Sequence, residues 1–233
     1  MTIVSYQQRR GELATYFDRT AVDAWARLTS TAPVSSIRAT VRAGRDDMRD
    51  TLLAMLPAYL QEQHVLDAGC GTGALSIGAA QRGAQVVAVD LSPTLIGLGT
   101  ERLPSKLGFG RIDFRVGDMC DTSLGEFDHV VAMDSLIHYQ LADVVPVLAG
   151  FAARTRRSIL FTFAPKTPAL SLMWAVGRLF PRKDRAPSIE PISEARLRRA
   201  LAAEPALQSW RVGRTRRVNS GFYKSQAMEL VRK

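Results

Sequence analysis

Cysteine and long apolar segments are both scarce in this sequence. Its 233 residues include two cysteines, Cys70 and Cys120, which are too few for a disulfide scaffold. No apolar run reaches the roughly 20 residues of a membrane-spanning helix. The basic residues near the N-terminus are not followed by the apolar core of a signal peptide. No group of cysteines and histidines has the spacing of metal ligands, so we expect no metal site. These absences favour a cytoplasmic protein.

Acidic residues are scarce in the last quarter of the chain. The formal net charge is +9, and residues 181–233 hold 13 basic and five acidic side chains. Such a surface attracts polyanions, anionic lipid or acidic small molecules, and it is equally compatible with a solvated face that binds nothing. The basic run Arg211–Arg217 lacks the interleaved aromatic residues of single-strand binders, so we expect no nucleic acid partner.

The pattern of apolar residues indicates alternating strands and helices. Helical spacing predicts two helices ahead of the first strand, over 6–30 and 36–56. Short apolar runs then predict strands at 64–69, 84–90, 111–118, 127–134 and 158–165, followed by two terminal strands at 206–214 and 222–231. The segments between them predict helices at 72–82, from Ser92-Pro93 onward, at 140–153 and at 193–203.

This alternation predicts an α/β fold with a doubly wound, mostly parallel sheet that helices cover on both faces. We divide the chain into an N-terminal helical lid, residues 1–57, and a core, residues 58–233. Several prolines between 165 and 191 predict that 166–192 is an insertion after the fifth strand. Its apolar stripe could cover a flat substrate, touch a membrane surface or belong to the core.

A glycine-rich turn, DAGCGTG at 67–73, follows the first strand of the core. Glycine lets the backbone turn tightly and approach a ligand closely, and the next helix directs free N–H groups toward the strand ends. This geometry binds nucleotides in many α/β folds. The spacing Gly69-x-Gly71-x-x-Ala74 also fits a dinucleotide site, and glycines that only make a turn remain an alternative.

Acidic residues at three strand ends favour an adenosyl sulfonium ligand over a pyrophosphate. Asp67 precedes the glycines, where a carboxylate suits an amino group or a water beside a methionine moiety. Asp90 ends the second strand and is suited to two ribose hydroxyls. After the third strand, Asp118 could accept a hydrogen bond from an adenine amino group, and Met119 could pack on the adenine ring.

As a set, DAGCGTG, VDLS (89–92) and GDM (117–119) resemble the motifs of the class I S-adenosylmethionine-dependent methyltransferases. The resemblance implies a seven-stranded, Rossmann-like sheet with S-adenosylmethionine as the methyl donor. It implies the following residues for the donor site: Asp67, Gly69, Cys70, Gly71, Gly73, Asp90, Leu91, Asp118, Met119 and Asp134. Asp134 could instead cap the next helix.

Further segments resemble the magnesium-protoporphyrin IX O-methyltransferase family of bacteriochlorophyll synthesis. They are YFDRTAVDAWARL (16–28), IRATVRAGRDDM (37–48), LIHY (136–139), FTFAPKTP (161–168), FPRKDR (180–185) and SGFYKSQAMEL (220–230). The resemblance implies methylation of one propionate of a Mg-porphyrin, in which magnesium is only part of the substrate. It also suggests the large subunit of magnesium chelatase as a partner and peripheral contact with the photosynthetic membrane. The alternatives are another acceptor, such as a quinone or phenol, and a non-catalytic porphyrin carrier.

The same resemblance makes His138 and Tyr16 candidate catalytic residues. His138 follows the fourth strand, where it could bind the propionate, sit over the magnesium or be an ordinary loop histidine. Because magnesium prefers oxygen ligands, we favour the carboxylate role. Tyr16 could orient the acceptor from the lid, although an aromatic residue at this spacing is equally compatible with core packing.

Three arginines and one tyrosine are candidates for the acceptor site. Arg38, Arg42 and Arg45 lie near one another on the second predicted helix, and arginine is suited to bidentate pairing with a carboxylate. One of them could hold the second propionate, while a solvated arginine face is the alternative. Tyr139 directly follows His138.

Overall fold

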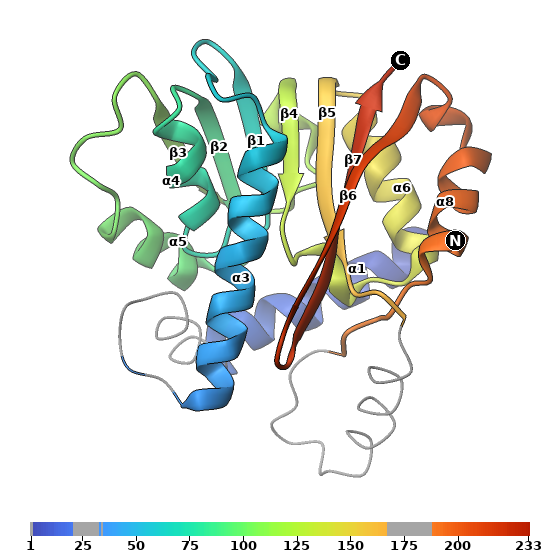
Figure 1. Cartoon of the computed structure of the whole chain (residues 1–233), viewed down its shortest axis with the longest axis horizontal. Coiled ribbons are helices and arrows are strands. Elements are labelled where there is room, and N and C mark those ends of the chain that lie inside the picture. Colours follow the sequence, from blue (N-terminus) through green and yellow to red (C-terminus); the bar gives the residue numbers. More distant parts are fainter. Residues whose placement is uncertain (1, 21–32, 34, 167–187) are drawn as a thin grey trace.

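The computed structural model describes residues 2–20, 33, 35–166 and 188–233, and its centre is a seven-stranded sheet (Figure 1). The strands are β1 (His64–Ala68), β2 (Gln85–Asp90), β3 (Arg111–Val116), β4 (Phe127–Ala132), β5 (Thr155–Phe163), β6 (Trp210–Ser220) and β7 (Tyr223–Arg232). They are ordered β3-β2-β1-β4-β5-β7-β6. The first five are parallel, and β7 runs antiparallel to both β5 and β6. The predicted mostly parallel sheet is therefore confirmed.

Helices flank the sheet and cross the edge where its parallel strands end. The helices are α1 (Thr2–Thr15), α3 (Ser36–Met55), α4 (Ala74–Ala80), α5 (Pro93–Glu101), α6 (Leu141–Ala152) and α8 (Glu194–Ala203). Shorter helical turns are η1 (Tyr16–Thr20), η2 (Thr122–Leu124), η3 (Leu136–His138) and η5 (Pro205–Leu207). α5 begins as its sequence predicts, because Ser92 Oγ accepts a hydrogen bond from Leu95 N at 3.2 Å and Pro93 takes the first helical position.

The central strands of the sheet are covered on both faces, which explains their continuous apolar residues. Every residue of β4 is buried. Val130 belongs to the hydrophobic cluster shared with α6 and α8, and its neighbour Val131 belongs to the cluster shared with α3 and α4. Figure 1 shows α3 in front of the sheet and α6 behind it. Successive side chains of a strand point to opposite faces, so two covered faces require apolar residues at consecutive positions.

The terminal hairpin differs from the sequence prediction in its first strand. β6 runs from Trp210 to Ser220, whereas the sequence predicts a strand over 206–214. Arg214 pairs with Glu229 of β7 at 2.6 Å and also bonds to the carbonyls of Ala54 and Met55 at the end of α3. Arg216 pairs with Asp47 of α3 at 2.8 Å. The two carboxylates offset the charges of Arg214 and Arg216, and the carbonyls accept further hydrogen bonds from Arg214. These contacts favour a strand in spite of its basic residues.

The N-terminal and inserted segments are described only in part. Residues 6–15 of the first predicted helix are helical in α1, and residues 16–20 continue it as the turn η1. Residues 21–30 of that prediction lie outside the described residues. Most of the predicted insertion, residues 167–187, also lies outside them. α1 crosses the lower edge of the sheet in Figure 1, and Ser5 Oγ donates to Asp143 Oδ1 of α6 at 2.6 Å.

Candidate active site

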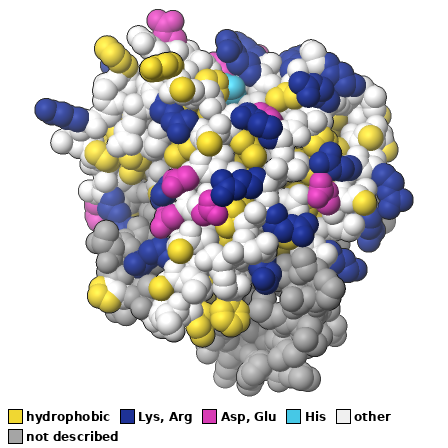
Figure 2. Space-filling view, viewed as in Figure 1, with side chains coloured by type: hydrophobic (Ala, Val, Ile, Leu, Met, Phe, Trp, Pro, Cys, Tyr) yellow, Lys and Arg dark blue, Asp and Glu magenta, His cyan; other side chains and the backbone are white. Residues whose placement is uncertain are grey.

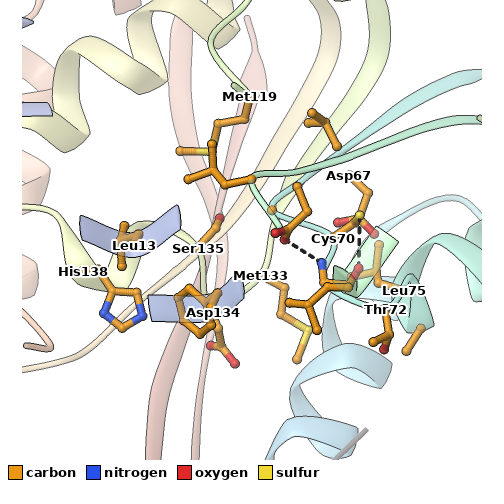
Figure 3. Close-up of a pocket in the computed structure, with 18 of the residues that line it drawn as sticks. Leu13, Asp67, Cys70, Thr72, Leu75, Met119, Met133, Asp134, Ser135 and His138 are labelled. Atoms are coloured by element: carbon orange, nitrogen blue, oxygen red, sulfur yellow. Dashed lines mark hydrogen bonds between the residues drawn. The ribbon is translucent and has the colours of Figure 1, made fainter. Parts of the chain in front are cut away.

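A cavity of about 660 Å³ lies at the carboxyl ends of the parallel strands. Its wall is made by the glycine-rich turn, the ends of β2, β3 and β4, and residues of α1, η1 and α3. Figure 3 shows Leu13, Ser135 and His138 on one side of the cavity and Asp67, Cys70 and Thr72 on the other. Ligands bind at this end of open α/β sheets because helix N-termini and loops meet there.

Two glycines of the turn are required by its geometry. Gly69 has a φ of 82°, and a Cβ at this position would lie 2.5 Å from the Cβ of Ser135. Gly71 has a φ of 56°, and a Cβ there would meet nothing within 4 Å. Gly69 therefore lets the turn pass close to the end of β4, while Gly71 leaves its backbone accessible to a ligand.

Asp90 supports the turn from the end of β2. Its Oδ2 accepts a hydrogen bond from Gly71 N at 2.8 Å, and its Oδ1 accepts one from Ser92 N at 3.0 Å. Burial raises the pKa of Asp90, against the opposing effect of these backbone bonds. The carboxylate is thereby fixed at the cavity wall in the position expected for an acceptor of ribose hydroxyls.

Asp67 is the most buried acidic group of the site, with 1% of its surface exposed. Burial raises the pKa of this carboxyl to about 7, although Ser76 Oγ donates a hydrogen bond to it at 2.6 Å and partly offsets the effect. The nearby Asp90 adds to the increase by charge repulsion. Asp67 thus titrates close to neutral pH, and a cation nearby would favour its ionised form.

Asp118, at the end of β3, connects the core to α1. Its carboxylate accepts hydrogen bonds from Tyr6 Oη and Arg10 Nη1, both at 2.6 Å, and from Cys120 N at 2.9 Å. Burial alone would raise the pKa of Asp118, but these bonds lower it below its usual value. The first helix is therefore held over the part of the cavity where Asp118 and Met119 lie.

The opposite wall carries His138 and aromatic residues. His138 is 9% exposed, and its Nδ1 lies 3.3 Å from the carbonyl oxygen of Ser188. The ring of Phe17 contacts His138 edge-on, with 5.9 Å between ring centroids. Tyr139 is buried and stacks on Tyr6 at 5.0 Å. Because a carbonyl only accepts hydrogen bonds, Ser188 fixes a hydrogen on Nδ1.

Most residues that the sequence assigned to the donor and the acceptor line the cavity. They are Asp67, Gly69, Cys70, Gly71, Asp90, Leu91, Asp118, Met119, Asp134, Arg42, Arg45, His138 and Tyr139. Gly73, Arg38 and Tyr16 do not line it. The Cβ position of Gly73 faces the ring of Phe114, Arg38 is exposed on the first turn of α3, and the ring of Tyr16 packs edge-on against Phe17. The roles of all these residues stay predictions.

The sequence analysis missed several residues of the wall. Tyr6, Leu13 and Phe17 share one face of the N-terminal helical segment, so the helical spacing that predicts the helix could also have indicated them. Arg49 lies one turn beyond Arg45 on α3, and the same spacing could have indicated it. No local signal indicates Ser135 or Met133, which the end of β4 brings to the cavity.

An adenosyl ligand fits the polar groups of this wall. Among the residues that the structure describes, Ser135 Oγ is the one buried side-chain oxygen or nitrogen without a hydrogen-bond partner. It lies beside Gly69, at the cavity wall. A buried hydroxyl without a partner is costly, so a bound polar group is its natural partner. Within the described residues, no cluster of acidic, histidine and cysteine side chains could hold a metal ion.

Comparison with known proteins identifies the family. The magnesium-protoporphyrin O-methyltransferase of Rhodobacter capsulatus is 48% identical to this chain over 225 residues, which are 96% of this chain and 97% of the relative. The chain belongs to the magnesium-protoporphyrin O-methyltransferases. The Synechocystis member of this family is 31% identical over 93% of this chain and 94% of its own length.

The structural comparison agrees with membership of the magnesium-protoporphyrin O-methyltransferases. A crystal structure of the Synechocystis enzyme with bound S-adenosylhomocysteine (SAH) superposes with a TM-score of 0.83 at 30% identity, covering 96% of this chain and 99% of that one. Family models described as a methyltransferase domain and as the magnesium-protoporphyrin IX methyltransferase C-terminus match residues 65–157 and 132–232. The chain is therefore a class I methyltransferase, and the predicted fold and family are both confirmed.

Proposed function

We propose that this chain transfers a methyl group from S-adenosylmethionine to one propionate of Mg-protoporphyrin IX, as a step of (bacterio)chlorophyll biosynthesis. The product is the monomethyl ester. One observation carries the proposal beyond family membership: a single cavity joins acidic and glycine residues suited to an adenosyl group with a wall that contains Arg42, Arg45 and His138. A cationic donor and an anionic acceptor can therefore meet inside it.

On the donor side, the residues would bind S-adenosylmethionine and orient it. Asp90 would accept hydrogen bonds from the ribose hydroxyls, Met119 would pack on the adenine, and Ser135 would bond to the methionine moiety. When bound, S-adenosylmethionine supplies a methyl group that its sulfonium has already activated. Asp118 already accepts hydrogen bonds from Tyr6 and Arg10 in this structure. Its predicted bond from the adenine amino group would be added to these two.

On the acceptor side, no general base is needed. A propionate has a reference pKa of about 4 and is ionised at neutral pH. The residues must therefore align the carboxylate and remove its water, and positioning alone can contribute on the order of 7–11 kcal/mol. Leu13, Phe17 and Met133 supply apolar surface at the cavity. Esterification removes the negative charge, which weakens the contacts with arginine and helps the product to leave.

We propose that His138 binds the reacting carboxylate. Since Nδ1 keeps its hydrogen for Ser188, a second N–H at Nε2 would make the ring an imidazolium that attracts the anion. Tyr16 lies outside the cavity wall, so we propose that it acts through Phe17, on which its ring packs at 5.2 Å. Arg38, which is exposed on α3, would attract the anionic acceptor from solvent. Gly73 would let the glycine-rich turn pack against Phe114.

A panel of acceptors tests the proposed function. Initial rates of methyl transfer would be measured with Mg-protoporphyrin IX, the metal-free porphyrin and a quinol, each with saturating S-adenosylmethionine. We expect turnover of the Mg-porphyrin, slower turnover of the metal-free porphyrin, and none of the quinol. Preferential methylation of the quinol would replace this proposal with the alternative of a phenol-type O-methyltransferase.

The affinity for S-adenosylmethionine should depend on pH through Asp67. Because burial raises the pKa of this group to about 7, it is mostly protonated at pH 6 and mostly ionised at pH 8. The ionised form attracts the cationic ligand, so the affinity should rise about tenfold over this range. Calorimetry with wild type and Asp67→Asn measures the effect. Any protonation change of the ligand itself affects both proteins equally, so the difference between them reports Asp67. An equally steep pH dependence in Asp67→Asn would contradict the assignment.

The lid and the insertion are proposed to close the cavity. Arg9 of α1 pairs with Glu190 at 3.3 Å, and Glu190 N donates to the carbonyl oxygen of Ile137 at 2.8 Å. The described end of the insertion, residues 188–192, is thus fixed beside α1 and η3. These contacts support a lid that includes α1 and an insertion (166–192) that covers the substrate. The rest of the proposed lid (1–57), which is largely α3, packs on the sheet of the proposed core (58–233).

We also propose a peripheral membrane contact and delivery of the porphyrin by the magnesium-chelatase large subunit, for a protein otherwise located in the cytoplasm. Among the described residues, no helix is long and apolar enough to span a membrane. Figure 2 shows basic side chains spread over the face formed by α3 and the β6–β7 hairpin. Such a face favours acidic partners, although Arg214 and Arg216 already pair within the chain.

A further inference from the structure

Asp134 has a backbone conformation that few non-glycine residues adopt. Its φ is 54°, in the left-handed region, and Glu62 is the one other non-glycine residue with a positive φ in the described parts of the chain. Such a conformation costs of order 1–3 kcal/mol and persists only where the surroundings hold it. Asp134 is the second residue after β4 and lines the cavity, so the strained position is at the site itself.

Buried hydrogen bonds hold the residue in this conformation. Asp134 N donates to Thr162 Oγ1 at 2.7 Å, and the same hydroxyl lies 3.2 Å from Asp134 Oδ1. Tyr223 Oη is 3.0 Å from both carboxylate oxygens, and Ser225 Oγ is 3.3 Å from Oδ1. Thr162, Tyr223 and Ser225 are all buried, and they come from the adjacent strands β5 and β7.

The carboxylate also holds Arg45 of α3. Arg45 Nη1 lies 2.8 Å from Asp134 Oδ2, and 6% of the Asp134 side chain is exposed. Tyr223 reaches this pair because the adjacent residue of α3 is Gly44, where a Cβ would lie 2.5 Å from Tyr223 Cδ1. The pair is therefore fixed from the sheet side, and the guanidinium of Arg45 is held at the cavity wall.

We infer that Asp134 is a positioning residue, which with Tyr223 holds Arg45 so that its guanidinium binds the propionate that is not methylated. This inference rests on the proposed function and names the residue that recognises the second propionate of the substrate. Both oxygens of Asp134 are engaged by side chains of the protein, which favours this role over direct contact with the methyl donor.

The planar shape of the guanidinium explains why the ion pair with Asp134 would help Arg45 to bind a carboxylate. A guanidinium has five donors in one plane, and in Arg45 the Nη1 donor bonds to Asp134. Fixing that plane reduces the rotamer entropy that would be lost when a carboxylate binds. An arginine without such a partner could bind the same anion, but its side chain would lose freedom on binding, and the affinity would be lower.

The test compares binding of two porphyrins, and it requires no turnover. Fluorescence titration gives two Kd values, for the monomethyl ester of Mg-protoporphyrin IX, which keeps the propionate that is not methylated, and for the dimethyl ester, which lacks it. Both are measured for wild type, Tyr223→Phe, Arg45→Ala and the double variant. Tyr223 does not line the cavity, so Tyr223→Phe alters the support of Asp134 without removing a ligand contact. We expect wild type to prefer the monoester about tenfold, as one charged hydrogen bond allows.

Tyr223→Phe should reduce this preference severalfold, and it should have no further effect in the Arg45→Ala background. SAH binding should stay as in wild type for both single variants. Glu126→Gln, which breaks the exposed pair of Arg156 and Glu126 at 2.9 Å, is the matched control and should leave every value unchanged. A merely structural role for Tyr223 would lower the melting temperature without changing the preference between the two porphyrins.

The outcomes separate this inference from the proposed function. A wild-type preference retained in Tyr223→Phe, or equal effects of Tyr223→Phe with and without Arg45, would overturn the positioning role while leaving methyl transfer intact. Absence of methyl transfer by wild type to any Mg-porphyrin would instead contradict the proposed function. Asp134→Asn provides a second variant, because asparagine tolerates the left-handed conformation but carries no charge for Arg45. It should also reduce the preference.

Discussion

Asp90→Ala should weaken the binding of S-adenosylmethionine about 100-fold, since hydrogen bonds to charged groups contribute roughly 1.5–3 kcal/mol each and two ribose hydroxyls lose their acceptor. The change also removes the acceptor for Gly71 N and Ser92 N, so the glycine-rich turn loses a support on both sides. Calorimetric titration with the methyl donor and with SAH measures the loss directly.

A matched control separates this effect from a general loss of negative charge. Asp113 lies on the neighbouring strand β3, is exposed and pairs with Arg115 at 2.7 Å. Asp113→Ala should bind both ligands as wild type does. If Asp90→Ala kept wild-type affinity while remaining folded, the adenosyl group would have to bind elsewhere than between β1 and β3.

His138→Ala should lower kcat about 100-fold, as loss of a positioning contact allows. The imidazole lies opposite the glycine-rich turn, so the Kd of S-adenosylmethionine should stay close to the wild-type value (Figure 3). Steady-state rates with Mg-protoporphyrin IX and equilibrium binding of the donor give the two quantities separately.

The conservative variant refines this prediction. His138→Gln keeps an N–H donor but cannot become a cation, so it should recover part of the lost rate. Wild-type turnover in His138→Ala would remove this residue from the mechanism.

Local sequence signals predicted the parts of the fold that short-range physics determines. The apolar runs become strands because both faces of the sheet are covered, and the glycine-rich turn follows β1 because glycine permits its positive φ values. The cap of α5 needs only Ser92 and Pro93. In each of these cases, the residues that decide the structure are neighbours in the chain.

Long-range contacts account for what the sequence did not predict. Tyr6 reaches Asp118 across 112 positions, and Tyr223 reaches Asp134 across 89. No periodicity relates such residues, so neither the fixing of α1 nor the conformation of Asp134 follows from a local pattern. The end of β6 was missed for the same reason, because the carboxylate that neutralises Arg216 is on α3.

The position of the transferred methyl group tests the central claim most directly. Wild-type protein would be incubated with Mg-protoporphyrin IX and S-adenosylmethionine labelled with carbon-13 in its methyl group, and the labelled atom would be located by nuclear magnetic resonance and mass spectrometry. The account predicts one label per porphyrin, bound to a propionate oxygen and released by mild alkaline hydrolysis. A label on carbon or nitrogen, or a porphyrin that stays unlabelled while the donor is consumed, would contradict it.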